Sequence, residues 1–257
     1  MIAGRAARGL CIGQLWGHAF CRSLRASPST RIRRVLSVRG LRKSYGGARA
    51  SAILRDVTLE VARGEFVAIM GESGVGKSTL LNLIAGLDTA DAGHIEVDGI
   101  DLGALDDSGR TLLRRDRLGF VFQAFHLLPH LTIIQNVRLP LDLAGVARTE
   151  SDRRAAAVLD AVGIGALARD YPRTLSGGEA QRAAIARALV HEPALVLADE
   201  PTGNLDEDSA AEVLALLRDA VKRRAGAGVL VTHSEAAART ADRVYVLTRA
   251  GLAERSA

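Results

Sequence analysis

Short apolar runs separated by helical patterns recur along most of the 257-residue chain. Two of these runs, 194–200 (ALVLADE) and 228–233 (GVLVTH), are almost continuously apolar, which is typical of central strands buried on both faces. Further strands are predicted on similar grounds over 53–61, 65–71, 94–99, 118–123 and 243–248. Strands that alternate with helices indicate an α/β fold, in which a parallel sheet is connected by crossover helices.

Helical periodicity fills the spaces between these strands. The predicted helices begin at Lys77, Thr149, Ser176, Glu207 and Ser234. Between Gln123 and Thr174 the strand signal is absent and helical patterning takes over. We therefore expect a helical subdomain, over about 124–178, inserted into the α/β core.

Positive charge is concentrated at the N-terminus. The formal net charge is +5, but residues 1–51 hold eleven of the 34 basic residues and no Asp or Glu. The remainder carries 23 basic residues against 29 acidic ones, so its charge does not indicate nucleic-acid binding. Aromatic residues make up 4% of the sequence and leave few surfaces for stacking on bases. We expect no nucleic-acid partner.

Residues 1–34 form a basic, acid-free leader. We expect a disordered extension or a start codon assigned too early, with the functional domain over 35–257; a transit peptide or a weak signal peptide is the alternative. Both cysteines, Cys11 and Cys21, lie in this leader, which fits a reducing compartment for the domain. No apolar run approaches the eighteen or so residues that span a bilayer.

A phosphate-binding loop is predicted over 71–79 (GESGVGKST), because the segment follows a strand and opens a helix. Its glycines let backbone N–H groups surround a phosphate. The dipole at the N-terminus of the following helix stabilises the phosphate's negative charge. Lys77 would neutralise the β- and γ-phosphates, and Ser78 would bind Mg²⁺. The chain has only three lysines, which makes a chance match to this pattern rare. The predicted phosphate-binding residues are Gly71, Glu72, Ser73, Gly74, Val75, Gly76, Lys77, Ser78 and Thr79.

Charged side chains stand at the ends of the two buried strands. Asp199 and Glu200 end one strand, and His233 ends the other. In open α/β sheets ligands bind at the carboxyl ends of the strands. Asp199 would therefore hold Mg²⁺, Glu200 would orient the attacking water, and His233 would reach the γ-phosphate. The alternatives are two acids that stabilise a helix start and a structural histidine.

A second glycine-rich helix start, 175–182 (LSGGEAQR), resembles an anion site but lacks a lysine. With the phosphate-binding loop, the Asp-Glu pair and the strand-end histidine in this order, residues 35 to about 252 resemble the ATP-binding subunit of an ABC transporter. Relatives often carry glutamine where this motif has Ala180. The resemblance implies a P-loop NTPase (RecA-like) core, an antiparallel β subdomain near the N-terminus and the helical insertion.

The resemblance also implies a homodimer that binds and hydrolyses ATP with Mg²⁺. In it, Ser176, Gly177 and Gly178 of one chain meet the γ-phosphate that Lys77 of the other chain holds. The missing lysine is then supplied by the partner, and hydrolysis loosens the dimer. Asp206 resembles the aspartate that crosses this interface.

Further roles are carried over from the family. Tyr45 in LRKSYGG resembles the aromatic residue that stacks on adenine, and Gln123 resembles the glutamine that senses Mg²⁺ and the attacking water. A loop tyrosine and a strand-end amide are the alternatives. One apolar cluster resembles the groove that receives a coupling helix of a membrane subunit, although it could equally belong to the core of the helical subdomain. Its members are Phe122, Phe125, His126, Leu127 and Leu128.

The segments 125–137 (FHLLPHLTIIQNV), 175–182 and 198–206 (ADEPTGNLD) look most like those of the subfamily of lipoprotein-releasing, macrolide-export and cell-division systems. Amino-acid importers share much of this pattern. The expected protein is peripheral to the cytoplasmic face of the inner membrane, where it powers a separate integral permease. A signalling ATPase without transport and a soluble ATPase that acts on ribosomes or nucleic acid are the alternatives.

Overall fold

The structure, a computed structural model, describes residues 34–46, 51–223 and 226–255. These residues belong to one compact unit that spans 32–257. The expectations for the leader and its cysteines lie outside the described residues. Arg34 already belongs to the first strand, and its guanidinium lies 3.0 Å from Glu60. The folded part therefore begins at least one residue before the predicted boundary.

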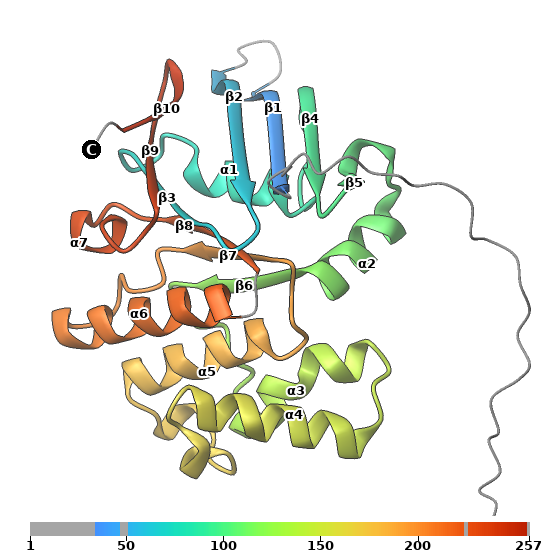
Figure 1. The fold of residues 1–257 in the computed structure, drawn as a ribbon, viewed down its shortest axis with the longest axis vertical. Coiled ribbons are helices and arrows are strands. Elements are labelled where there is room, and N and C mark those ends of the chain that lie inside the picture. The colour runs from blue at the N-terminus through green and yellow to red at the C-terminus, as the bar shows by residue number, and fades with distance from the viewer. Residues whose placement is uncertain (1–33, 47–50, 224–225, 256–257) are drawn as a thin grey trace, which may run out of the picture. The chain divides into compact units, whose positions relative to one another are not determined.

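Two sheets are formed by the described residues (Figure 1). The larger sheet has six strands in the order β10-β9-β3-β8-β7-β6, in which only β10 is antiparallel to its neighbour. Its strands are β3 (Phe66–Met70), β6 (Leu118–Phe122), β7 (Leu195–Asp199), β8 (Ala227–Val231), β9 (Arg243–Thr248) and β10 (Gly251–Glu254). The predicted parallel core is confirmed.

The smaller sheet is antiparallel and comes mainly from the first third of the described chain. Its strands, in the order β2-β1-β4-β5, are β1 (Arg34–Tyr45), β2 (Ser51–Ala62), β4 (Ala92–Val97) and β5 (Ile100–Asp101). Helix α1 (Lys77–Ile84) lies between the two sheets and contributes four apolar residues to the core that they share. This sheet is the antiparallel subdomain that the resemblance implies.

Helices cover the other face of the parallel sheet and form a separate lobe (Figure 1). Helices α5 (Gly177–Leu189) and α6 (Glu207–Arg223) pack on the sheet. Helices α3 (Ile133–Leu143) and α4 (Arg148–Ala161) build a core of their own, to which α5 also contributes residues. The remaining helices are α2 (Asp107–Arg117), α7 (Glu235–Ala238) and the 3₁₀ turns η2 (Leu102–Ala104), η3 (Gly165–Leu167) and η4 (Pro172–Thr174).

The predicted elements differ from the observed ones mostly by one or two residues at each end. Ser176 and Ser234 are N-caps rather than first helical residues, and α4 begins at Arg148 instead of Thr149. The strands β1, β5 and β10 and the helix α2 were not predicted. Along β1 buried and exposed positions do not alternate regularly, so it shows no clear strand period. Helix α2 is strongly polar and has a single buried residue, Leu113, so it offers few apolar residues from which a helix could be identified.

Candidate functional site

The loop between β3 and α1 folds around a buried ammonium group. Lys77, which is 8% exposed, donates from Nζ to the carbonyl oxygens of Gly71 (2.8 Å) and Glu72 (3.0 Å). Gly76 has φ +112°, and a Cβ atom there would lie 2.7 Å from Cγ2 of Ile53. Only glycine combines this backbone conformation with so close an approach to β2. The loop is thus held in a fixed curve around Lys77.

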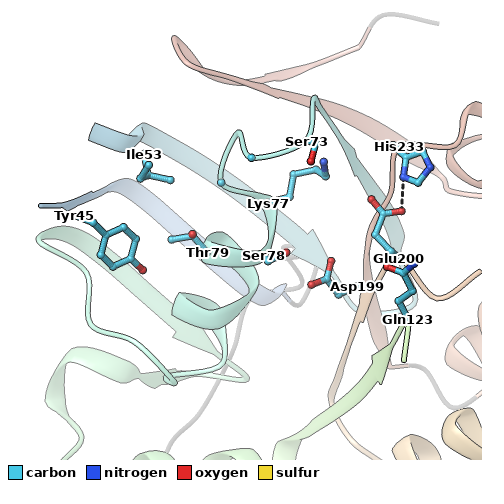
Figure 2. Close-up of a pocket in the computed structure, with 12 residues that line it drawn as sticks. Tyr45, Ile53, Ser73, Lys77, Ser78, Thr79, Gln123, Asp199, Glu200 and His233 are labelled. Carbon is cyan, nitrogen blue, oxygen red and sulfur yellow. Dashed lines mark ion pairs between the residues drawn. The ribbon is translucent and has the colours of Figure 1, made fainter. Parts of the chain in front are cut away.

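A pocket of about 510 Å³ opens above this loop. Figure 2 shows Tyr45 and Ile53 at one end, the acidic and imidazole side chains at the other, and the side chains of Lys77 and Ser78 between them. The pocket is lined by Tyr45, Ile53, Ser73, Gly74, Gly76, Lys77, Ser78, Thr79, Gln123, Asp199, Glu200 and His233. Gly71, Glu72 and Val75 belong to the same loop but do not line the pocket.

Asp199 and Glu200 enter the pocket from the carboxyl end of β7. Burial raises the pKa of Asp199, which the neighbouring Glu200 charge raises further, against the lowering effects of a hydrogen bond with Ser78 and of the Lys77 charge. Oxygen ligands such as this carboxylate and the Ser78 hydroxyl are those that Mg²⁺ prefers. Asp199 and Ser78 therefore fit a magnesium ion beside the phosphate-binding loop.

Glu200 has an unusual backbone conformation, with φ +48°. Its N–H donates to the carbonyl of Val231 (2.9 Å) and its carbonyl accepts from Gly203 (3.1 Å), so the neighbouring strand and the turn hold it in place. Oε2 of Glu200 lies 2.8 Å from Nδ1 of His233 (Figure 2). His233 follows β8 and is 71% exposed. Strained non-glycine residues are frequent at sites where a side chain must have one direction.

Gln123 is joined to a residue that the sequence did not identify as part of the site. Nε2 of Gln123 donates to Oδ1 of Asn204 (3.1 Å), and Nδ2 of Asn204 donates back to the Gln123 carbonyl (3.0 Å). A Cβ atom at Gly203 would lie 2.7 Å from Nε2 of Gln123. The loop that follows Glu200 thus holds the glutamine at the edge of the pocket.

Four predicted site residues outside the phosphate-binding loop also do not line this pocket: Ser176, Gly177, Gly178 and Asp206. Ser176 caps the start of α5, where its Oγ accepts from the N–H of Glu179 and the Glu179 carboxylate accepts from the Ser176 N–H. Asp206 accepts from the N–H of Ser209 (2.9 Å) at the start of α6. Ser176, Gly177 and Asp206 are exposed in the single chain.

The fold and the pocket define a class before any comparison. A lysine in a phosphate-binding loop, two carboxylates at the end of the parallel strand β7 and an oxygen site for Mg²⁺ together indicate a nucleoside triphosphate-hydrolysing domain.

Comparison with known proteins gives the family. Residues 54–203 match the family described as "ABC transporter". The lipoprotein-releasing system ATP-binding protein LolD of Pseudomonas syringae pv. tomato is 47% identical over 221 residues, which are 86% of this chain and 97% of that protein. The methionine import ATP-binding protein MetN 2 of Burkholderia mallei is 49% identical over 193 residues, 74% of this chain but 48% of that protein. The chain belongs to the ABC transporter family.

The structure is also similar to a solved ATP-binding cassette, MJ0796, in a dimeric post-hydrolysis state bound to ADP and Pi. The TM-score is 0.78 and the identity 38%, over 86% of this chain and 98% of the other. Within the family this chain is accordingly an ATP-binding subunit with ATPase activity that binds ATP together with Mg²⁺. No helix among the described residues is long and apolar enough to cross a membrane.

Proposed function

We propose that two copies of this chain close head to tail around ATP and thereby drive a separate membrane permease from its cytoplasmic face. One observation carries the proposal: the pocket of a single chain contains the phosphate-binding loop and the carboxylates but nothing from the capped start of α5. Ser176 and Gly177 at this capped helix start are exposed, and the dipole of α5 favours an anion there. In a head-to-tail dimer, the γ-phosphate bound by the loop of the second copy would be the anion beside this turn. The chain's own phosphate-binding loop is not beside the turn.

Each pocket residue then has a separate task in converting ATP and water to ADP and phosphate. Lys77 neutralises the β- and γ-phosphates, and the carboxylate of Glu200 orients the attacking water. His233 holds Glu200 through Nδ1, 2.8 Å from Oε2. Asp199, Ser78 and Gln123 would hold Mg²⁺, which supplies charge neutralisation at the phosphates when it is bound.

A trapped dimer tests this proposal. We expect Glu200→Gln to bind ATP and Mg²⁺ but to hydrolyse it very slowly, so that the protein elutes as a dimer in size-exclusion chromatography with light scattering. Lys77→Ala is the control: it should not bind ATP, because the triphosphate loses its lysine, and it should therefore remain a monomer. Adding Ser176→Arg to Glu200→Gln should abolish the dimer and leave ATP binding intact, because Ser176 is outside the chain's own pocket. A Glu200→Gln protein that stays monomeric with ATP bound contradicts the closed dimer.

We further infer that the permease belongs to a lipoprotein-releasing type of system. The LolD protein is matched over nearly its whole length, whereas the matched region is less than half of MetN 2. Co-purification from membranes, followed by identification of the bound permease, tests the assignment. A permease that transports a free amino acid would contradict it, and a membrane partner without transported cargo would favour the signalling alternative.

A further inference from the structure

At the aromatic end of the pocket, Tyr45 is supported by Lys43, which lies two positions earlier on β1. Tyr45 lines the pocket and is 47% exposed, while Lys43 is 8% exposed. Nζ of Lys43 lies 4.8 Å from the centre of the Tyr45 ring. An ammonium group at this distance over an aromatic face is attracted by the ring. Lys43 therefore contacts the ring of Tyr45 directly.

Asp88, in the turn after α1, joins both residues. Its Oδ1 accepts from Nζ of Lys43 (2.8 Å), and its Oδ2 accepts from the hydroxyl of Tyr45. Lys43 also donates to the carbonyl of Thr89 (2.7 Å). The hydrogen bonds from Lys43 and Tyr45 lower the pKa of Asp88, so the carboxylate is ionised at neutral pH and accepts on both oxygens.

The cluster could have a purely structural role, in which it links β1 to the loop after α1. That role alone does not explain why Lys43 and Asp88 both contact Tyr45. Such a link already exists next to the cluster: the N–H of Ser44 donates to Oδ2 of Asp91 (2.7 Å), and the N–H of Asp91 donates to the carbonyl of Arg42 (3.0 Å). What the Lys43–Asp88 pair adds is control of the Tyr45 ring. The carboxylate fixes the hydroxyl end, and the ammonium group lies over the ring.

We propose that Lys43 and Asp88 are positioning residues for the nucleotide base. They hold the Tyr45 ring in one orientation before the nucleotide arrives and leave it free to stack on the adenine. The inference rests on the proposed role of Tyr45 in ATP binding. Its physical basis is preorganisation: a side chain that is already ordered loses less conformational freedom when the ligand binds. Through Asp88, the positioning cluster also connects the base-binding residue Tyr45 to the loop that follows helix α1.

The test compares two ligands that differ in the base. Dissociation constants of the full chain are measured with Mg²⁺ for ATP and for inorganic tripolyphosphate, which has no base to stack. We expect Lys43→Met and Asp88→Asn to weaken ATP binding about three- to tenfold, the effect of ordering one side chain. Tripolyphosphate binding should stay unchanged, which also demonstrates that the variants are folded. Lys43→Arg, which keeps the charge, should restore most of the ATP affinity.

Tyr45→Ala separates this inference from the role on which it rests. Equal ATP affinity in the wild type and in Tyr45→Ala would overturn the stacking role itself. If Tyr45→Ala weakens ATP binding but Lys43→Met and Asp88→Asn do not, only the positioning role is overturned. Equal weakening of ATP and tripolyphosphate in Lys43→Met and Asp88→Asn would overturn it as well. In the Tyr45→Ala background, Lys43→Met should have no further effect on ATP affinity, and a further loss there contradicts the proposal.

Discussion

Single residues in the site are directed by neighbours that come from other strands and loops. Glu200 keeps a backbone conformation that costs about 1–3 kcal/mol for a non-glycine residue. It keeps this conformation because Val231 and Gly203 bond its peptide groups on both sides. Gln123 is held in a similar way by Asn204, through two reciprocal hydrogen bonds. The chemistry thus depends on residues that do not themselves line the pocket.

Asn204 provides a test at this scale. We expect Asn204→Ala to lower kcat about tenfold or more, the usual effect of removing a group that orients a metal or water ligand. The KM for ATP should change little, because the phosphate-binding loop is untouched. Steady-state ATPase assays at several Mg²⁺ concentrations measure both constants. The same substitution in a Gln123→Ala background should have almost no effect, and an undiminished loss there would show that Asn204 acts independently of Gln123.

The sequence predicted most of the site, because strand ends carry its chemistry. Asp199, Glu200 and His233 were placed there by the rule that parallel strands present their carboxyl ends together. Gln123 was carried over from the family resemblance, and the structure brings all four to one pocket. Their roles remain proposals. The contacts of Gln123 with Asn204 and of Tyr45 with Asp88 could not be predicted, because they join residues 81 and 43 positions apart, each pairing the end of a strand with a distant turn.

At the scale of elements, α5 connects the α/β core with the helical lobe. One part of its surface packs on the parallel sheet and another packs in the lobe. Its Arg187 also donates to the carbonyls of His126 (2.6 Å) and Phe125 (2.8 Å), two residues with positive φ in the segment after Gln123. The predicted apolar cluster is consequently divided: Phe122 lines a groove, whereas Leu127 packs against the lobe core.

The start of β3 gives a prediction on stability. Oδ2 of Asp242 accepts from the N–H of Phe66 (2.9 Å), and its Oδ1 lies 2.5 Å from Nζ of Lys222 in α6. We expect Asp242→Ala to lower the free energy of unfolding by about 1–3 kcal/mol, because it leaves a buried N–H without its acceptor. Urea denaturation measures the loss. Asp242→Asn, which can still accept from Phe66, should lose less.

The same substitution has a predictable pH dependence. Burial raises the pKa of Asp242, but the hydrogen bonds from Lys222 and Phe66 outweigh it, and the net shift is downward. A carboxyl group with a lowered pKa in the folded state stabilises above its unfolded pKa of about 4, and this contribution is lost as the pH falls further. The difference between wild type and Asp242→Ala should therefore be complete at pH 7 and shrink below about pH 4. A difference that grows on acidification would contradict this assignment.

Buried elements were predicted from the sequence more reliably than exposed ones. The strands β3 and β8 are buried at every position, and their apolar runs identified them. The edge strand β10 has no buried residue and was missed. The predicted helical subdomain had no strand signal, and the elements that the structure describes between Gln123 and Ser176 are all helical. Its boundary is harder to draw from sequence, because α5 packs in both cores.

At the scale of the whole chain, two sites meet at the end of β6. Phe122 lines a groove of about 470 Å³, and Gln123, the next residue, lines the nucleotide pocket. The groove has apolar walls from Phe120, Phe122 and the α3 residues Leu139 and Leu143. The groove is also lined by Arg114, Arg115 and Arg187. A segment bound in the groove would thus contact the residue that precedes Gln123 in the chain, which suits a subunit that transmits ATP hydrolysis to another protein.

The groove is where we expect the permease to dock, and Leu143 allows a test that does not disturb the pocket. Leu143 is 66% exposed in the single chain, so Leu143→Asp should fold normally. Because an apolar contact would acquire a charge, we expect the variant to lose the permease in co-purification from membranes. Its basal ATPase activity should be unchanged. Leu112→Asp is the matched control, since Leu112 is an exposed leucine that does not line the groove, and it should retain the permease. Retention of the permease by Leu143→Asp would mean that docking occurs on another surface.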